Sequence, residues 1–341
     1  MIRVCINGLG RIGRNCFRLI QNSDDIEVVH LNDPNMSLKN LVYLLNYDSI
    51  YGRNESLITS DEENLIDKNR KVSFSQVSDP MELQPKLKDI DVFIESSGVI
   101  NVQNNAAKLA RDKIVKKTVI THTYKSADKT IILGVDSSSS CENKDSVIST
   151  SICDSTAVAP IIQAVMNLKE IETGTITTLH PWLQYQNLMD GPCRSFAHPH
   201  QNVENFSLGR ARTEAIIPKT TSCIEAVNEV HPNLRDRIFG MSFRVPTPSV
   251  SCAIIDLNTD SDLTSAELFS EFEKINNNYD KKIFYLNNEE LISRDFTGLP
   301  YSAIIDKRWI VIKEKKLRVI AWYDNEYGYC SRVLDIIKKI V

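Results

Sequence analysis

Residues 2–20 of the chain read IRVCINGLGRIGRNCFRLI, and this stretch decides the fold. The run 2–6 is rich in apolar residues, as expected of a buried strand, and 11–20 is expected to form a helix. Gly8, Gly10 and Gly13 have the G-x-G-x-x-G spacing, in the strand–turn–helix context that a dinucleotide-binding loop requires. Gly8 allows a tight turn, Gly10 lets the backbone approach a pyrophosphate, and Gly13 lets strand and helix pack closely. With only 12 glycines in 341 residues, chance would produce the pattern roughly 0.015 times in such a chain.

A carboxylate follows the next predicted strand. Residues 26–31 read IEVVHL, and Asn32 and Asp33 come directly after them. An acid at about this distance from the glycines binds the ribose hydroxyls of NAD, and it would repel the additional phosphate of NADP. The alternative is that Asp33 and Pro34 only end a strand, because both residue types are common in turns. Together with the glycine motif, the acid favours NAD as the cofactor.

The alternation of strands and helices continues to about residue 150 and predicts a doubly wound parallel sheet. The polar stretch 137–145, SSSSCENKD, is expected to be a loop near a domain boundary. A helix-like stretch, 153–168, and several long β-branched runs without short βαβ repeats come after it. This second half is therefore expected to form a mixed or antiparallel sheet with helices on one face, and the last residues, 331–341, to form a helix.

Composition narrows the possible functions. The chain has 40 Lys and Arg against 44 Asp and Glu, with no concentrated basic stretch, so a nucleic-acid partner is not expected. No apolar run approaches the roughly 20 residues of a membrane helix, and no secretory signal is recognisable, so we expect a cytoplasmic protein without a membrane partner. Eight cysteines are scattered singly, as is typical of reduced thiols.

Cys153 has the most suggestive surroundings among these cysteines. It lies in STSICDSTAVAPIIQAVM, where small hydroxylated residues lead into a helical pattern. At a helix start, free N–H groups and the helix dipole favour the reactive thiolate. His180, at the end of the run GTITTLH, is a plausible base. Spacing alone leaves open that Cys153 is a structural thiol and His180 a core histidine.

Several blocks along the whole chain resemble one family. They are INGLGRIGR at 6–14, NDP at 32–34, LVYLLNYDSIYG at 41–52, SSGV at 96–99, TTLH at 177–180, DGP at 190–192, GMSFRVPT at 240–247 and WYDNEYGY at 322–329. In these blocks, and in the Cys153 segment, the chain resembles the glyceraldehyde-3-phosphate dehydrogenases from end to end. The resemblance implies an α/β fold, with a Rossmann NAD-binding domain at 1–152, an α+β catalytic domain with a mixed or antiparallel sheet at 153–320, and a C-terminal helix at 321–341 that returns to the first domain. It also implies a homotetramer.

The resemblance assigns roles by matching position. In such enzymes a cysteine attacks the aldehyde, hydride passes to NAD⁺, and phosphate cleaves the acyl-enzyme; Cys153 and His180 match the nucleophile and the base. Asn325 matches the residue that holds the nicotinamide carboxamide, and Tyr329 the aromatic residue beside that ring, although core packing is the alternative for Tyr329. The other implied cofactor contacts are Gly8, Gly10, Arg11, Ile12, Gly13, Asn32, Asp33, Ser96, Ser97 and Gly98.

The chain departs from the family at both anion sites. Family members usually read SCTTN around the cysteine, whereas positions 152–156 here read ICDST. At an effective dielectric constant of about 20, the Asp154 carboxylate would raise the energy of an incoming phosphate by about 2–4 kcal/mol at 4–8 Å. It would also oppose thiolate formation at Cys153. The alternative is that Asp154 points outward and only favours the helix N-terminus.

The expected site for the substrate's own phosphate is altered too. Leu183 and Tyr185 replace two threonines of the family pattern, and Ser222 replaces a glycine. Thr221 and Arg244 remain, and the planar guanidinium of Arg244 can still bind a phosphate or a carboxylate. The expected substrate-binding residues are thus Asp154, Leu183, Tyr185, Thr221, Ser222 and Arg244.

The segment 190–218 is longer than the family pattern by roughly nine residues, and in the family this loop reaches toward a neighbouring subunit's cofactor. The insertion could change either the substrate pocket or the assembly. Its Cys193, His198 and His200 are weak metal candidates, because two histidines around a proline lack zinc-site spacing, and we predict no metal.

These observations predict NAD-dependent oxidation of an aldehyde, with or without a phosphate group, through a cysteine-bound thioester, with an altered substrate or acyl acceptor. One alternative is the ordinary phosphorylating glyceraldehyde-3-phosphate dehydrogenase reaction. The other is a catalytically weak protein that only binds NAD or serves in an assembly.

Overall fold

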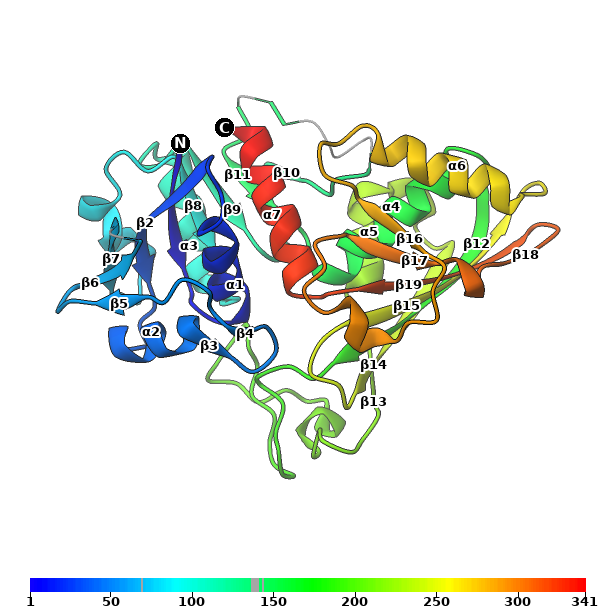
Figure 1. Cartoon of the computed structure of the whole chain (residues 1–341). Helices are drawn as coiled ribbons and strands as arrows, with labels where there is room; N and C mark the ends of the chain where they lie inside the picture. The colour runs from blue at the N-terminus through cyan, green and yellow to red at the C-terminus, as the bar shows by residue number, and fades with distance from the viewer. Residues whose placement is uncertain (69, 136–140, 143) are drawn as a thin grey trace.

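The computed structural model describes residues 1–68, 70–135, 141–142 and 144–341. Two domains lie side by side, each built on its own sheet, and the C-terminal helix runs between them (Figure 1). The predicted loop at 137–145 falls largely outside the described residues.

The first sheet has nine strands in the order β10-β11-β9-β8-β1-β2-β7-β6-β5. From β10 to β7 the neighbouring strands are parallel, and β6 and β5 continue the sheet as an antiparallel edge. The strands are β1 (Ile2–Asn7), β2 (Ile26–Asn32), β5 (Thr59–Ser60), β6 (Asn64–Asp67), β7 (Arg70–Ser75), β8 (Val92–Glu95), β9 (Lys117–Ile120), β10 (Lys129–Thr130) and β11 (Val147–Ser149). The helices are α1 (Arg11–Ile20), α2 (Leu38–Asn46) and α3 (Ile100–Arg111), and β3 (Tyr47–Asp48) pairs with β4 (Gly52–Arg53).

Both faces of this sheet carry a hydrophobic core. Val4 of β1 packs in the same core as Phe17 of α1, whereas the next residue, Cys5, packs in the core that contains Leu109 of α3. Alternate residues of a strand point to opposite faces, so α1 and α3 cover opposite sides of the sheet. The predicted doubly wound Rossmann arrangement is confirmed.

The second sheet has eight strands and is mixed, as predicted. Its order is β13-β14-β12-β15-β19-β17-β16, with β18 paired to β19; β12 with β14 and β16 with β17 are parallel, and the other pairs are antiparallel. The strands are β12 (Ile171–Pro181), β13 (Ile217–Lys219), β14 (Ile238–Val245), β15 (Ser251–Thr259), β16 (Phe284–Asn287), β17 (Ala303–Asp306), β18 (Val311–Lys313) and β19 (Lys316–Tyr323).

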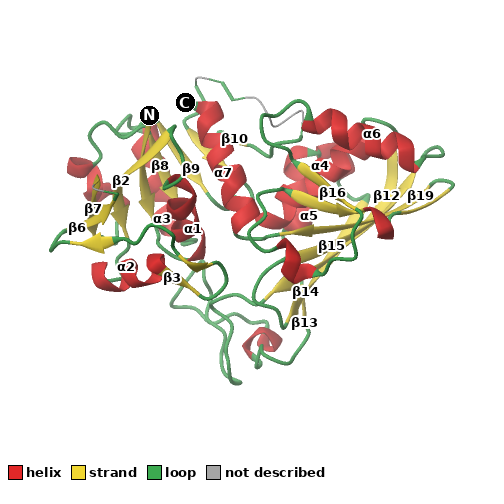
Figure 2. Ribbon diagram, in the orientation of Figure 1, coloured by secondary structure: helices red, strands yellow, loops and turns green. Residues whose placement is uncertain are grey.

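The three α-helices described in this domain cover one face of the mixed sheet (Figure 2). They are α4 (Cys153–Met166), α5 (Cys223–Val230) and α6 (Ser265–Asn276). Ile176 of β12 and Ile255 of β15 are fully buried in the core with these helices. On β14 and β18, Phe239, Met241 and Val311 are exposed instead.

Helix α7 (Tyr327–Ile340) joins the two domains, and it begins four residues earlier than the predicted 331–341. It follows β19 of the second sheet and packs against α1 of the first domain, where the Cys330 thiol lies 3.5 Å from the carbonyl oxygen of Ile12. Just before the helix, Glu326 forms an ion pair with Arg11 at 2.6 Å.

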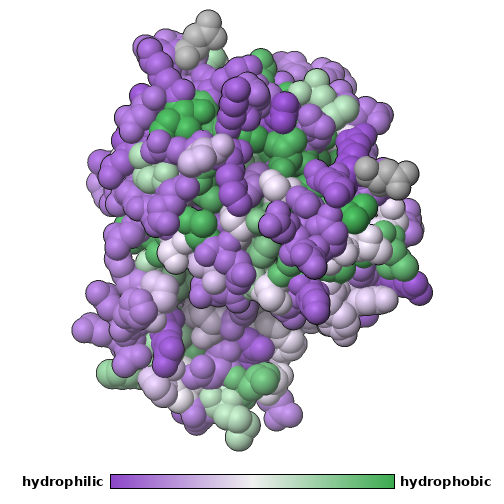
Figure 3. Space-filling view, turned by 90° about the vertical axis from the view of Figure 1, so that its left-hand side faces the viewer, coloured by the Kyte–Doolittle hydropathy of each residue, from purple (hydrophilic) through white to green (hydrophobic). Residues whose placement is uncertain are grey.

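The surface facing the viewer in Figure 3 mixes hydrophilic and hydrophobic residues and is largely hydrophilic. Within the described ranges, no helix has the length and apolar character needed to cross a bilayer.

Candidate active site

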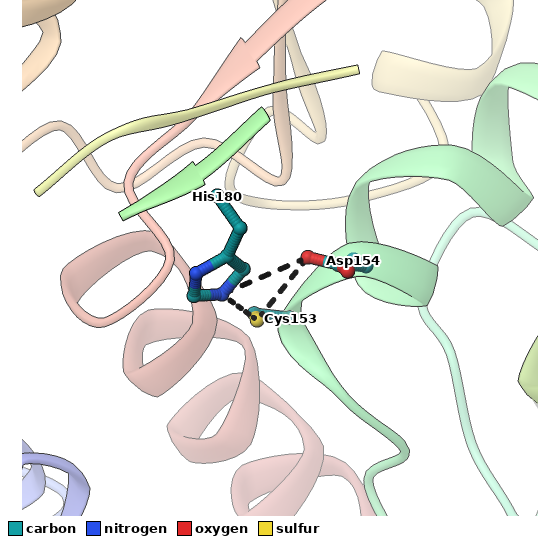
Figure 4. Close-up of side chains that lie close together, drawn as sticks. All are labelled: Cys153, Asp154 and His180. Carbon is teal, nitrogen blue, oxygen red and sulfur yellow. Dashed lines mark hydrogen bonds and ion pairs between the residues drawn. The ribbon is translucent and has the colours of Figure 1, made fainter. Parts of the chain in front are cut away.

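Three side chains that the sequence singled out come together between α4 and the end of β12 (Figure 4). The Cys153 sulfur lies 3.6 Å from Nε2 of His180 and 3.6 Å from Oδ1 of Asp154. The Asp154 oxygen is 3.9 Å from the same His180 nitrogen. The predicted contact between thiol and imidazole is therefore present, and a carboxylate shares it.

A strained turn positions the sulfur at the first residue of α4. Ser151 has a φ of +59°, a left-handed conformation that costs a residue other than glycine about 1–3 kcal/mol. Two hydrogen bonds hold this turn: the Tyr329 hydroxyl donates to the Ser151 carbonyl at 3.0 Å, and the Ile152 amide donates to Oγ of Ser155 at 3.3 Å. The turn thus fixes where the helix begins and where Cys153 points.

Asp154 points into the site and not toward solvent. The residue is only 7% exposed, and its Oδ1 accepts a hydrogen bond of 2.8 Å from the hydroxyl of Tyr323, at the end of β19. The alternative of an outward-facing carboxylate therefore does not hold in this structure. Sequence reasoning missed Tyr323, although it lies in the WYDNEYGY block.

The thiol and the imidazole are both neutral at pH 7. Burial, and then the Asp154 carboxylate, raise the pKa of the Cys153 thiol well above its ordinary value. Burial, and then the cation of Arg244, lower the pKa of His180 to about 4. Desolvation and the neighbouring carboxylate thus outweigh the effect of the helix start, which was expected to favour a thiolate.

The tautomer of His180 follows from its hydrogen bond. Its Nδ1 lies 2.8 Å from the carbonyl oxygen of Pro181, which can only accept, so Nδ1 carries the proton. The lone pair of Nε2 is then directed toward the Cys153 sulfur, and the ring can receive the thiol proton.

Arg244 supplies the positive charge of the site. It is the register partner of His180 between β14 and β12, and it is 7% exposed. Among the described residues, no carboxylate forms an ion pair with it, and its buried Nε has no hydrogen-bond partner. Sequence reasoning also missed Lys219. Burial is the main cause that lowers the pKa of its ammonium group, and the charges of Arg244, Asp154 and Cys153 influence that pKa as well. An unpaired buried guanidinium fits an anionic ligand.

The three glycines have the geometry that was predicted from their spacing. Gly8 has a φ of +84°, and an added Cβ would lie 2.5 Å from the Ser97 amide nitrogen. A Cβ on Gly13 would lie 2.0 Å from the Gly8 carbonyl oxygen. At Gly10, by contrast, a Cβ would meet no described atom within 4 Å. The open side of the loop is therefore at Gly10, where a pyrophosphate can approach the backbone.

Two predicted cofactor residues, Asp33 and Ser96, form hydrogen bonds with the backbone of this loop. Oδ2 of Asp33 accepts the Leu9 amide at 2.8 Å, and Oγ of Ser96 donates to the Gly8 carbonyl at 2.7 Å. The side chain of Asn32 is fully buried, and its Nδ2 donates a hydrogen bond of 2.7 Å to Oδ1 of Asn7. Asn32 therefore holds neighbouring strands together beneath the loop and does not face the groove.

Other predicted contacts have different partners. The Arg11 guanidinium forms ion pairs with Asp48 and Glu326, and Ile12 is half-buried against the core. The Ser97 amide donates to Glu95 at 2.7 Å. Burial raises the pKa of Glu95 to about 7.

Asn325 and Tyr329 belong to the C-terminal block, where β19 leads into α7. Asn325 is 5% exposed, and its buried Oδ1 has no hydrogen-bond partner among the described residues. Such an orphaned acceptor fits the amide N–H₂ of nicotinamide. Tyr329 is buried, and its hydroxyl lies 2.8 Å from the hydroxyl of Thr150, so it packs in the core and holds the turn before Cys153.

The expected phosphate residues do not all gather around the cysteine. The ring of Tyr185 packs on Phe196 at 6.1 Å between centroids, within the small core of the 190–218 loop, and the neighbouring Leu183 is half-buried. Oγ1 of Thr221 accepts a hydrogen bond of 3.0 Å from the Cys223 amide, and Ser222 precedes α5 without a capping hydrogen bond from its side chain.

The 190–218 loop also reaches the cofactor domain of its own chain. Phe196 lies against Gly98, because a Cβ added to Gly98 would lie 2.6 Å from the ring of Phe196. The amide of Ile100 donates to the Ala197 carbonyl at 3.3 Å. His122, another residue that sequence reasoning missed, lies at the same place, and burial lowers its pKa to about 4.

Two family models match the chain. "Glyceraldehyde 3-phosphate dehydrogenase, NAD binding domain" matches residues 2–103, and "Glyceraldehyde 3-phosphate dehydrogenase, C-terminal domain" matches residues 152–325. The chain belongs to the glyceraldehyde-3-phosphate dehydrogenase family.

Relatives with this name match the whole chain. Glyceraldehyde-3-phosphate dehydrogenase 2 of Bacillus subtilis is 32% identical over 340 residues, covering 99% of this chain and 96% of the relative. Glyceraldehyde-3-phosphate dehydrogenase 1 of Saccharomyces cerevisiae is 33% identical over 341 residues, covering 100% and 99%. Glyceraldehyde-3-phosphate dehydrogenase of Geobacillus stearothermophilus is 33% identical over 340 residues, covering 99% and 98%. This member of the glyceraldehyde-3-phosphate dehydrogenase family is thus an NAD-dependent dehydrogenase.

Proposed function

We propose that this family member uses NAD⁺ to oxidise an aldehyde that bears an anionic or sugar-like group, and that a neutral acceptor such as water receives the acyl group. Cys153 is the nucleophile, His180 the general base, and Arg244 the receptor for the anionic group. The observation that carries the proposal is the inward-facing Asp154 carboxylate, 3.6 Å from the Cys153 sulfur.

The carboxylate discriminates between acyl acceptors. At an effective dielectric constant of about 20, it raises the energy of a phosphate anion by about 2–4 kcal/mol over 4–8 Å. A water molecule or an alcohol carries no charge to repel and can donate a hydrogen bond to the same oxygen. The site therefore favours a neutral acceptor over inorganic phosphate.

Each step of the reaction uses groups of this chain. Nε2 of His180 takes the proton from Cys153 while the sulfur attacks the carbonyl carbon, and it passes this proton to the carbonyl oxygen, which becomes the hydroxyl group of a hemithioacetal. When bound, NAD⁺ supplies the hydride acceptor that allows this adduct to become a thioester. His180 takes the proton of the adduct's hydroxyl group and releases it to solvent. Water then adds to the thioester carbon while His180 takes one of its protons. The C–S bond breaks, and His180 returns this proton to the sulfur as the carboxylic acid leaves.

Arg244 is suited to orient such a substrate. Its guanidinium is buried and unpaired among the described residues, and it is beside His180 in the sheet. A bidentate contact with a phosphate or carboxylate group of the substrate satisfies its donors. The apolar packing of Tyr185 argues that this anion site has fewer hydroxyl donors than the sequence suggested.

The test is an assay of NADH formation with a panel of aldehydes. Glyceraldehyde 3-phosphate, glyceraldehyde and other sugar-like aldehydes are each offered with NAD⁺, with and without phosphate or arsenate. We expect NADH formation that phosphate does not accelerate. Asp154→Thr should acquire or increase phosphate dependence, whereas Asp280→Thr, at an exposed position, should behave as the parent does.

The ordinary phosphorylating reaction is the second candidate, because it is favoured by the names of the relatives described above. Acceleration of NADH formation by phosphate with glyceraldehyde 3-phosphate in the parent protein would establish it and refute the neutral-acceptor proposal. NAD binding without NADH from any aldehyde would indicate a protein that only binds the cofactor.

We further propose a homotetramer. The open face of the mixed sheet exposes Phe239, Met241 and Val311, and a second copy could bury these side chains. Light scattering should give the mass of four chains. A stable monomer at micromolar concentration would contradict this.

A further inference from the structure

Cys153, Asp154 and His180 form a triangle of three different metal-ligand atoms. Sγ, Oδ1 and Nε2 all lie within 4.8 Å of one another. The separate distances are 3.6 Å from sulfur to nitrogen, 3.6 Å from sulfur to oxygen and 3.9 Å from nitrogen to oxygen. Figure 4 shows the three side chains directed toward one common point.

These distances can be compared with a tetrahedral zinc centre. Zinc lies about 2.3 Å from a cysteine sulfur and about 2.0–2.2 Å from imidazole nitrogen and carboxylate oxygen. At tetrahedral angles, the sulfur is then about 3.5 Å from each of the other two ligand atoms, which are about 3.4 Å from each other. The triangle in this chain is within about half an ångström of that geometry on every side.

Hydrogen bonds already orient both partners of the sulfur. His180 donates from Nδ1 to the Pro181 carbonyl at 2.8 Å, which is the arrangement that leaves Nε2 free for a metal. The Tyr323 hydroxyl donates to Oδ1 of Asp154 at 2.8 Å, and that oxygen has a second lone pair to offer. Outer contacts of this kind fix first-shell ligands in metal sites.

We propose that Cys153, Asp154 and His180 bind a divalent transition-metal ion of the zinc type, leaving its fourth coordination position open to solvent. On binding, the Cys153 S–H bond breaks, its proton passes to solvent, and the sulfur forms a bond to the metal. Thiolate and carboxylate together balance the two positive charges, and the imidazole stays neutral. The family pattern SCTTN has no carboxylate at this position, so the third ligand is a departure from that pattern.

Metal binding has a direct consequence for the thiol. The electron pair that would attack a carbonyl carbon is held by the metal, so the metal-bound form cannot form a hemithioacetal. A chelator restores the thiol. The proposal departs from the prediction of no metal. That prediction considered Cys193, His198 and His200 of the 190–218 loop and did not consider Cys153, Asp154 and His180 together.

The test uses Co²⁺ as a spectroscopic probe on the purified full chain, treated with a chelator and free of NAD and aldehyde. We expect one equivalent to bind, with the near-ultraviolet band of a cobalt–thiolate bond and the visible bands of tetrahedral cobalt. Zn²⁺ should displace it. Cys153→Ser should abolish the thiolate band, and Asp154→Asn should weaken binding at least about tenfold.

Matched variants exclude other sites. Cys141→Ser removes another partly exposed thiol, and His198→Asn with His200→Asn removes the loop histidines; both proteins should give the parent spectrum. Absence of cobalt binding, a thiolate band that survives Cys153→Ser, or an affinity unchanged in Asp154→Asn would each overturn the proposal. Circular dichroism of each variant checks its fold. Because neither NAD nor aldehyde is present, the result is independent of whether the proposed dehydrogenase reaction is correct.

Discussion

The carboxylate of Asp154 contacts the thiol of Cys153, the ring of His180 and the hydroxyl of Tyr323. It is therefore placed to alter thiol reactivity, the choice of acyl acceptor and affinity for cations through one charge. Burial strengthens each effect, because fewer water dipoles are available to screen the charge.

Replacement of this carboxylate should increase the reactivity of the thiol. In the parent protein, the pKa of Cys153 is raised by burial and by Asp154, so alkylation by iodoacetamide should increase steadily with pH through pH 9 without a plateau. Asp154→Thr removes the second cause, and the rate at pH 7 should increase severalfold, because a lower thiol pKa means a larger thiolate fraction.

Both proteins should carry Cys141→Ser, so that the other partly exposed thiol does not contribute. The Asp280→Thr protein is the control for loss of an acid elsewhere. An unchanged alkylation rate in Asp154→Thr would show that the carboxylate does not control the thiol.

Asn325 provides a second prediction for a single residue. Its buried Oδ1 lacks a partner among the described residues, and an N–H donor of the cofactor amide would satisfy it. Asn325→Ala should weaken NAD binding about two- to tenfold, in line with about 0.5–1.5 kcal/mol for one hydrogen bond. Titration calorimetry measures this, and equal affinity in parent and variant would rule out the contact.

At the scale of elements, two glycines of the same loop have different roles: Gly13 is needed for folding and Gly10 for cofactor binding. A Cβ on Gly13 would overlap the Gly8 carbonyl at 2.0 Å, whereas a Cβ on Gly10 meets no described atom within 4 Å. Gly13 thus lets α1 pack against β1, whereas Gly10 keeps the cofactor groove open.

Gly13→Ala should therefore lower the melting temperature, since backbone must move to admit the methyl group. Gly10→Ala should leave the melting temperature within a few degrees of the parent and reduce NAD affinity. Thermal unfolding without the cofactor and NAD titration separate the two effects. Equal melting temperatures for both variants would contradict this account.

The same elements show what the sequence could predict. The helix at 11–20 was located to the residue because glycines precede it, and the helix of Cys153 begins where the small hydroxylated residues end. Contacts between distant segments, such as the hydroxyl of Tyr323 on Asp154, follow from the packing of β19 against the start of α4 and have no local pattern. The buried partners of Asn32 escaped prediction for the same reason, because a motif gives the position of a side chain and not its direction.

At the scale of the whole molecule, buried histidines should make the fold sensitive to acid. Burial is the main cause that lowers the pKa of His30, His122 and His180 to about 4 each, against about 6.5 in an unfolded chain. As pH falls from 6.5 toward 4, the unfolded chain takes up protons at these residues and the folded chain does not, so stability is lost. Glu95, whose pKa burial raises to about 7, acts in the opposite direction by holding a proton in the folded state.

Unfolding near pH 5 should therefore take up about two protons in total. The free energy of unfolding should then change by about 2.7 kcal/mol per pH unit. Calorimetry in buffers of different ionisation enthalpy counts these protons directly. His30→Gln should reduce the count by one. A melting temperature that stays constant from pH 7 to pH 5 would exclude the effect.

The ion pair between Arg11 and Glu326, and the packing of α7 on α1, join two segments that are far apart in the sequence. A ribosome adds the residues of α7 after the strands of the first domain, yet α7 covers apolar side chains of that domain. The N-terminal domain cannot complete its core during synthesis, even though N-terminal domains generally fold first. A nascent chain halted before Tyr327 should leave α1 exposed to chaperones and proteases, and the synthesis and docking of α7 is the event that protects it.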